Sequence, residues 1–314
     1  MSVYVFRNAT SESARELAMA LGGNKIRHND RIGFYRKVGE ERRRIQLNNR
    51  DVVVCWGEML EPQNGCRVLN GAAIRNKYDD AVRLRQAGVP TVEVSLTQPR
   101  VAPAPPPIDP AQAVWDTAQE EAREFTETGF NRHPILIDGI AGMIRRMTEL
   151  QAALRQPAPQ PLPAQPDVTW LPRLRNHVGG NDLLTPPTRA EFWVKKLDLV
   201  REFRVHSFFG RSIRAGLKRE REGFPTPHPW IRSHDAGWGI IYDGVSSRQA
   251  HRNLAHQACE ALGLQFGAID IGEQADGSLV VLEANRAPGL ENGTVTRYAG
   301  AITRWMHGEL EEAR

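Results

Sequence analysis

Two acidic residues near the C-terminal end of the chain are placed to face each other across a β-hairpin. Asp276-Gly277 separates two β-rich runs, and this dipeptide is the strongest short signal for a tight hairpin loop. With these two residues as the loop, Asp270 lies directly opposite Glu283, and Asn285 shares a face with Glu283. Opposed side chains on one hairpin face have Cβ atoms about 4.5 to 5.5 Å apart. Two carboxylates at that distance repel each other unless one is protonated or a cation lies between them.

A divalent cation is the simplest answer to this repulsion, with Asn285 as a third oxygen donor. Mg²⁺ commonly binds one or two protein carboxylates and leaves its remaining positions to water and nucleotide phosphates. Asp270, Glu283 and Asn285 are therefore predicted metal ligands. The alternative is a surface hairpin whose acids point to solvent, and the neighbouring residues decide between the two.

A second polar surface is predicted on the strand that contains Glu202. Residues 202–206 alternate polar and apolar types, so Glu202, Arg204 and His206 share one face while Phe203 and Val205 pack inward. An acid and a guanidinium on one face suit a nucleotide, because a carboxylate binds ribose hydroxyls and an arginine binds phosphate. An ordinary exposed sheet face would show the same alternation.

A basic strand upstream leads into a small glycine loop. Arg173 and Arg175 fall on one side of this strand, and Gly179 and Gly180 follow it. Backbone N–H groups in such a loop are able to cover phosphates, since glycine allows a close approach. These four residues are therefore candidate phosphate contacts.

Lys218 is a further candidate phosphate contact. A tight turn at Gly210-Arg211 would place Lys218 opposite Phe203, on the wrong face of the sheet. A role for Lys218 at the nucleotide therefore requires a bulge or a longer loop.

The composition is typical of a soluble globular protein. The 314 residues, 40% hydrophobic and 25% charged, predict about two domains with a sizeable core. There is no N-terminal export segment and no apolar run of about 18 residues, so we expect a cytoplasmic protein that does not bind membranes. Cys55, Cys66 and Cys259 form no CxxC pair and are expected to be buried thiols.

A basic block at residues 27–50 carries a local excess of positive charge. It holds eight Lys or Arg residues against three acids, and its net charge of +5 exceeds the +4 of the whole chain. The block is either a solvated face or a site for an acidic substrate or a nucleic acid.

The elements that must position these residues fall into three segments. Residues 1–96 predict a small α/β domain with a parallel sheet, because strand and helix signals alternate in it as in βαβ units. The expected elements are a strand at 3–6, a helix from Ser13 with a Ser13–Glu16 capping box, a strand at 51–56, a helix at 76–87 and a strand at 91–94.

The second segment, 97–168, contains Pro-rich stretches that bracket two predicted helices, near 110–128 and 134–155. An oligomerisation arm, a substrate lid and a clamp are all left open for them. The third segment, 169–314, is β-rich. It contains a helix at 247–262, which a Ser246–Gln249 capping box begins and Gly263 closes, and a final helix from Thr294.

Four segments of the chain resemble the ATP-grasp superfamily, which includes D-alanyl-D-alanine ligase, glutathione synthetase and the ribosomal-protein glutamate ligases. They are 76–90, 192–206, 262–271 and 282–290. The resemblance implies an α/β (α+β) fold: a small N-terminal substrate-side domain at 1–96, a helical insertion at 97–168 and the nucleotide- and metal-binding region at 169–314.

The resemblance also implies roles for the candidate residues. Asp270, Glu283 and Asn285 would ligate Mg²⁺, or Mn²⁺ in its place, against the phosphates of ATP, and Asn285 would also take part in catalysis. The backbone of the hinge around Lys195, Lys196 and Leu197 would read adenine, with Glu202 on the ribose. Arg204 and Lys218 would contact phosphates or an acyl phosphate, and Arg173 or Arg175 would take the place of the usual phosphate lysine.

Such enzymes activate a carboxylate with ATP and let an amine displace phosphate. We therefore expect an ATP- and Mg²⁺-dependent ligase whose acceptor is an acidic peptide, a protein or a nucleic acid. The alternatives are a kinase of a small polyol or phosphorylated substrate and a non-catalytic nucleotide-binding module. Assembly into a homo-oligomer is left open.

Overall fold

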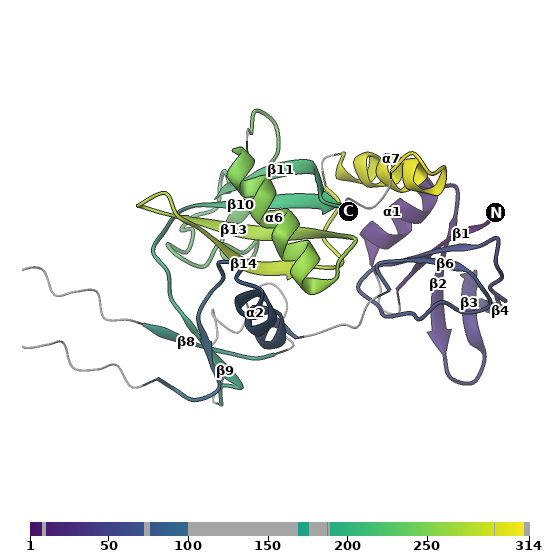
Figure 1. Cartoon of the computed structure of the whole chain (residues 1–314), viewed down its shortest axis with the longest axis horizontal. Coiled ribbons are helices and arrows are strands. Elements are labelled where there is room, and N and C mark those ends of the chain that lie inside the picture. Colours follow the sequence, from purple (N-terminus) through teal and green to yellow (C-terminus); the bar gives the residue numbers. More distant parts are fainter. Residues whose placement is uncertain are drawn as a thin grey trace, which may run out of the picture. The chain divides into compact units, whose positions relative to one another are not determined.

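Figure 1 shows the fold as a computed structural model. The structure describes residues 1–7, 11–71, 76–99, 169–175, 187, 189–245, 247–291 and 293–310. Met1–Pro99 and Trp170–Arg314 together form one compact unit, to which the following paragraphs refer. The two helices expected near 110–128 and 134–155 lie outside the described residues, so they stay predictions, as do the three domain boundaries.

The N-terminal part is a six-stranded mixed sheet in the order β4-β3-β2-β1-β5-β6. Its strands are β1 (Val3–Phe6), β2 (Asn24–Asn29), β3 (Gly33–Val38), β4 (Glu41–Arg44), β5 (Val52–Cys55) and β6 (Arg67–Leu69). β1 pairs in parallel with β2 and β5, and β5 pairs in parallel with β6. The expectation of a parallel sheet is thus only partly right, because much of the basic block folds back as the antiparallel strands β3 and β4.

The N-cap of helix α1 (Glu12–Ala20) lies two residues before the expected capping box. Ser11 is the N-cap, and its side chain accepts a hydrogen bond from the Ala14 N–H. Ser13 instead accepts from the Leu290 N–H at 3.2 Å, far away in the sequence. α1 packs on α7 (Thr294–Met306), and residues of both helices share a core cluster with Trp56.

The C-terminal part is a five-stranded antiparallel sheet in the order β12-β11-β10-β13-β14. Its strands are β10 (Leu199–Phe208), β11 (Arg211–Glu220), β12 (Trp238–Ile241), β13 (Phe266–Gln274) and β14 (Leu279–Asn285). Helix α6 (Gln249–Leu262) covers one face of it (Figure 1). The buried stripe of α6 packs on apolar residues of β10, β13 and β14, which leaves the opposite face for polar side chains.

The start of α6 differs from the expected capping box. Arg248 is the N-cap and makes no side-chain cap hydrogen bond, while Ser246 lies outside the described residues. The expected end is confirmed, since Gly263 adopts the left-handed conformation with φ 68°.

Helix α2 (Lys77–Gln86) and the strand after it join the C-terminal part. The Asn76 side chain caps α2 by accepting from the Asp79 N–H. β7 (Val94–Ser95) pairs with β9 (Phe192–Lys195) in a three-stranded sheet completed by β8 (Trp170–Arg173). The expected third strand of the N-terminal βαβ unit is therefore wrong, because Thr91 and Val92 hydrogen-bond to Val281 of β14.

The three cysteines are buried and free, as expected. Burial raises the pKa of Cys55 and of Cys259 to about 12, so both stay protonated. None of the helices in the described part of the chain combines the length and the apolarity that a membrane crossing requires.

Candidate active site

The β13–β14 hairpin brings Asp270 and Glu283 opposite each other, as the sequence predicted. Its loop is one residue longer than expected: the Gln274 N–H donates to Ser278 O at 3.0 Å and the Gly277 N–H donates to Gln274 O at 2.9 Å. Gly277 has φ 81°, which glycine tolerates without strain.

This longer loop shifts the inner pairs of the hairpin by one residue. Ile271 pairs with Val281, whereas Asp270 pairs with Glu283, so Leu282 is an extra residue on β14. Such a β-bulge moves the following side chains to the other face of the strand. The expected pairing of Asp270 with Glu283 is thus confirmed, because the longer loop and the bulge at Leu282 shift the register by one residue in opposite directions.

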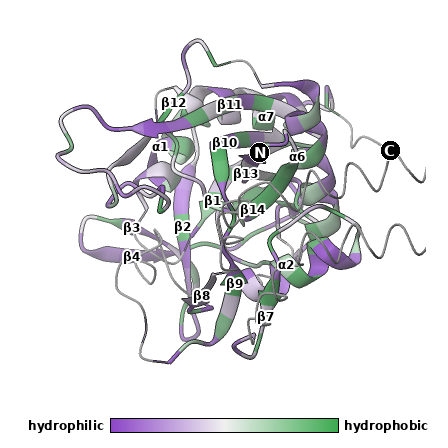
Figure 2. Cartoon of the chain, turned by 90° about the vertical axis from the view of Figure 1, so that its left-hand side faces the viewer, coloured by the Kyte–Doolittle hydropathy of each residue, from purple (hydrophilic) through white to green (hydrophobic). Residues whose placement is uncertain are grey.

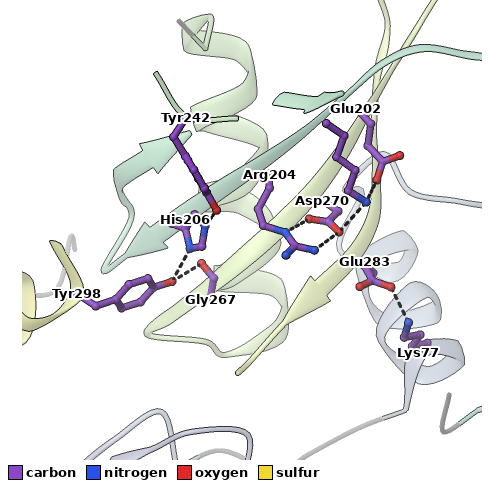
Figure 3. Close-up of polar contacts among 10 residues, drawn as sticks. Lys77, Glu202, Arg204, His206, Tyr242, Gly267, Asp270, Glu283 and Tyr298 are labelled. Atoms are coloured by element: carbon purple, nitrogen blue, oxygen red, sulfur yellow. Dashed lines mark hydrogen bonds and ion pairs between the residues drawn. The ribbon is translucent and has the colours of Figure 1, made fainter. Parts of the chain in front are cut away.

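Asp270 is held by two cations from neighbouring strands (Figure 3). Arg204 binds it with both arms of the guanidinium, Nε to Oδ1 at 2.7 Å and Nη2 to Oδ2 at 2.8 Å. Lys218 Nζ lies 3.4 Å from Oδ2. Burial alone would raise the pKa of Asp270, but Arg204 and Lys218 outweigh it and hold that pKa below its usual range. Asp270 is therefore ionised although its side chain is only 2% exposed.

Lys218 reaches this face because β11 contains the required bulge. The turn lies at Phe209-Gly210 instead of Gly210-Arg211, and the pairing shifts between His206 and Ser207. Phe203 therefore faces Leu217, and Lys218, one residue further, donates to Glu202. Burial and the nearby Asp270 raise the pKa of Glu202, although Lys218 opposes them.

Glu283 has a cationic partner that the sequence reasoning did not identify. Lys77 Nζ, in the first turn of α2, lies 2.6 Å from Glu283 Oε2 (Figure 3). Burial would raise the pKa of Glu283, but Lys77 lowers it below the usual value. Both opposed carboxylates are thus ionised, and three cations surround them.

Asn285 lies opposite Ala268, two residues beyond Glu283 on β14. Its Nδ2 is buried and has no hydrogen-bond partner among the described residues. A carboxylate offers about four lone-pair sites, so Asp270 and Glu283 retain acceptor capacity beside their cations. The two ionised carboxylates therefore fit a Mg²⁺ site that phosphate and water oxygens complete, whereas the unpaired atom of Asn285 is an N–H donor and not a metal ligand. Among the described residues, no group of three or more His, Cys, Asp or Glu side chains could hold a metal by itself.

His206 lies on the same face of β10 as Glu202 and Arg204. Its side chain is fully buried, with Nδ1 3.2 Å from Tyr298 Oη and Nε2 3.0 Å from Tyr242 Oη. Tyr298 donates to Gly267 O at 3.3 Å, so its oxygen accepts from Nδ1–H and Tyr242 donates to Nε2. Burial and the charge of Arg204 lower the pKa of His206 to about 3, and the imidazole stays neutral.

These side chains line a cleft of about 410 Å³ on the open face of the five-stranded sheet. Of the candidate residues, nine line it: Arg173, Lys195, Lys196, Leu197, Glu202, Arg204, Lys218, Asp270 and Glu283. Arg175 and Asn285 do not line it, and Gly179 and Gly180 lie outside the described residues. The Arg175 guanidinium lies 5.4 Å from the centre of the Tyr78 ring instead.

The cleft also contains residues that the sequence analysis did not propose. Lys77, Trp230 and Arg232 are among them. The sequence held one indication that Lys77 has an acidic partner, because a cation in the first turn of a helix opposes the helix dipole. That partner is 206 positions away in the sequence, and no local pattern identifies it.

Comparison with known proteins agrees with this architecture. No family model and no curated protein matches the sequence. Among solved structures, the ATP-grasp ligase PsnB in complex with a minimal precursor is similar, with a TM-score of 0.52, 14% identity and coverage of 96% of this chain and 98% of that one. The D-cycloserine synthetase DcsG has a TM-score of 0.50, 14% identity and coverage of 98% and 100%. The chain has the ATP-grasp fold, as expected.

Proposed function

We propose that this chain is an ATP- and Mg²⁺-dependent ligase that activates a carboxylate as an acyl phosphate and joins it to an amine. The observation that carries the proposal is the pair of opposed, ionised carboxylates, Asp270 and Glu283, which Arg204, Lys218 and Lys77 surround in one cleft. Acidic and cationic side chains packed this closely suit a metal ion with a polyphosphate, because each charge of the ligand meets a partner of opposite sign.

Asp270 and Glu283, which line the cleft, would hold Mg²⁺ against the phosphates, and the amide oxygen of Asn285, two residues further on β14, is proposed as a third ligand. When bound, the ion neutralises charge that develops on phosphate oxygens during phosphoryl transfer. Arg204 and Lys218 are fixed donors beside it, and their ion pairs with Asp270 hold them in place before a substrate arrives. The chain thus supplies charge stabilisation, and the reaction requires no protein nucleophile.

The remaining lining residues suit the nucleoside. The stretch Lys195–Leu197 begins at the last residue of β9 and lines the cleft. The Lys195 N–H donates to Glu93 O at 2.9 Å, so the backbone of Lys196 and Leu197 is the part proposed to bind adenine. Glu202 is proposed for the ribose hydroxyls. Of the two arginines considered for the position of the usual phosphate lysine, Arg173 lines the cleft and Arg175 does not, which favours Arg173.

The function is tested by supplying Mg²⁺-ATP with an array of carboxylate and amine pairs. The ligase proposal expects ADP, inorganic phosphate and a condensed product in equal amounts, and it expects ADP release to require the amine. A kinase would release ADP in mixtures that contain no amine. It would form a phosphorylated product and release no free phosphate. Nucleotide binding without turnover across the array would identify a non-catalytic module.

A further inference from the structure

A second charged surface lies on the N-terminal sheet and plays no part in the cleft. Arg27 pairs with Tyr35, Tyr35 pairs with Arg44, and Lys37 pairs with Arg42. Directly paired residues point to the same side of a sheet, and so do residues two apart on one strand. Tyr35 therefore shares one face of β2, β3 and β4 with four cations, Arg27, Lys37, Arg42 and Arg44, here called the basic face.

The opposite face of the same strands is apolar. Ile26 and Phe34 point there and are buried in a core cluster with Phe6 and Leu47. On the basic face, Lys37, Arg42 and Arg44 are exposed, whereas Tyr35 is only 7% exposed and the Arg42 guanidinium lies 5.3 Å from the centre of its ring. This side of β3 and β4 therefore presents Lys37, Arg42 and Arg44 to solvent.

The cations of the basic face are not neutralised within the part of the chain that the structure describes. None of the four forms an ion pair there, whereas Arg43, on the opposite face, lies 3.6 Å from Glu41. The pKa of Lys25, two residues before Arg27 on β2, responds to the same excess of positive charge. Burial lowers its pKa first, and the positive charges of Arg27, Arg7 and Arg15 lower it further. A concentrated positive potential of this kind attracts an anionic partner.

The backbone geometry favours an extended peptide as that partner. β4 is the edge strand of the sheet, and no further strand of the described residues pairs with its outer side. In Figure 2, β4 carries the hydrophilic colour of its sequence. Arg42 and Arg44 are two residues apart, or about 6.6 Å along a strand, which matches the carboxylates at alternate positions of an extended chain. Strand addition at an exposed edge is an established mode of peptide recognition.

We propose that the basic face and the edge of β4 bind an acidic peptide segment in an extended conformation. This inference deepens the proposed function and rests on it in one respect, namely that the bound peptide carries the carboxylate substrate. Charged edge strands also prevent unwanted pairing between proteins. That role explains exposed charge on β4, but it does not explain why Arg27 and Lys37, on inner strands, carry the charge onto the same face.

The direct test is fluorescence anisotropy with the full chain and a labelled peptide of alternating Glu and Thr, in the absence of ATP and Mg²⁺. The matched peptide of alternating Gln and Thr measures binding that does not depend on charge. The variant Arg42→Gln/Arg44→Gln removes two charges from the basic face. The control Arg31→Gln/Arg43→Gln removes two exposed charges that lie off this face.

We expect the Glu peptide to bind and the Gln peptide not to bind. The basic-face variant should weaken binding by roughly fivefold or more, while the control should change it by less than about twofold. Equal losses in both variants would overturn the proposal, as would a failure of the Glu peptide to bind. Tighter binding of a single-stranded oligonucleotide of equal charge would overturn it in favour of a nucleic acid.

The outcome is separable from that of the catalytic proposal. If the peptide binds and Mg²⁺-ATP is never turned over, the docking surface stands and the proposed function fails. If turnover occurs and the basic-face variant leaves the KM for acidic peptides unchanged, the docking proposal fails alone.

Discussion

Lys77 Nζ lies 2.6 Å from Glu283 Oε2, and this contact ties the first turn of α2 to the centre of the cleft. A lysine in that position competes with any metal ion for the same carboxylate. Its ion pair should therefore weaken metal binding to the protein without nucleotide, and it leaves Glu283 ionised for the nucleotide-bound state.

Lys77→Met is accordingly expected to tighten Mn²⁺ binding to the nucleotide-free protein by roughly two- to fivefold, the strength of one partly exposed ion pair. Titration followed by electron paramagnetic resonance measures this directly. Lys196→Met is the matched control, since Lys196 lines the same cleft but lies over the Trp230 ring. Equal changes in both variants would show that only the net charge of the cleft matters.

The Lys218–Glu202 pair predicts a stability effect. The Glu202 side chain is buried and that of Lys218 is only 12% exposed, so Lys218→Met leaves an unpaired carboxylate in the sheet and should reduce the free energy of unfolding by about 3 kcal/mol. The double variant Lys218→Met/Glu202→Gln should recover at least half of that loss, because no buried charge remains unpaired. Urea denaturation of the single and double variants measures both quantities, and additive losses would contradict the account.

His206 predicts a dependence of stability on pH. Its pKa is lowered to about 3 in the folded protein, against about 6.5 in the unfolded chain. The unfolded state therefore binds a proton first, so the stability from the neutral imidazole is complete above about pH 6.5 and is lost as the pH falls toward 3.

In His206→Gln, whose amide is able to bond both tyrosines, the free energy of unfolding should fall less steeply between pH 7 and pH 5 than in the unchanged protein. Chemical denaturation at several pH values gives the two slopes. His251, whose pKa is also lowered by burial and then by Arg248, remains in both proteins and cancels in the comparison. Parallel slopes would show that His206 is not the group that titrates.

The hairpin shows how far local patterns predicted the site. Asp276-Gly277 located the loop and the opposed pair Asp270–Glu283 correctly. The three-residue loop and the Leu282 bulge were not foreseen, because the dipeptide allows more than one loop length and a bulge has no clear sequence signal. The pairing was confirmed because these two shifts cancel.

Local sequence patterns could not predict the contacts between distant segments, for a different reason. Lys77 meets Glu283, and Arg204 meets Asp270, only after separate elements pack together. Strand alternation correctly placed Glu202, Arg204 and His206 on one face. It gave no information about which cations would face them, and Lys218 joined them only through the bulge in β11.

The most direct test of the central claim is Mg²⁺-dependent ADP release by Glu283→Gln, measured with the substrate pair that the unchanged enzyme uses. Gln keeps the size of the side chain and removes its charge, so the fold should persist while the rate falls by roughly 100-fold or more. Asp276→Asn removes an acid from the exposed loop of the same hairpin and should keep full activity. A Glu283→Gln variant that folds and retains full Mg²⁺-dependent turnover would contradict the account.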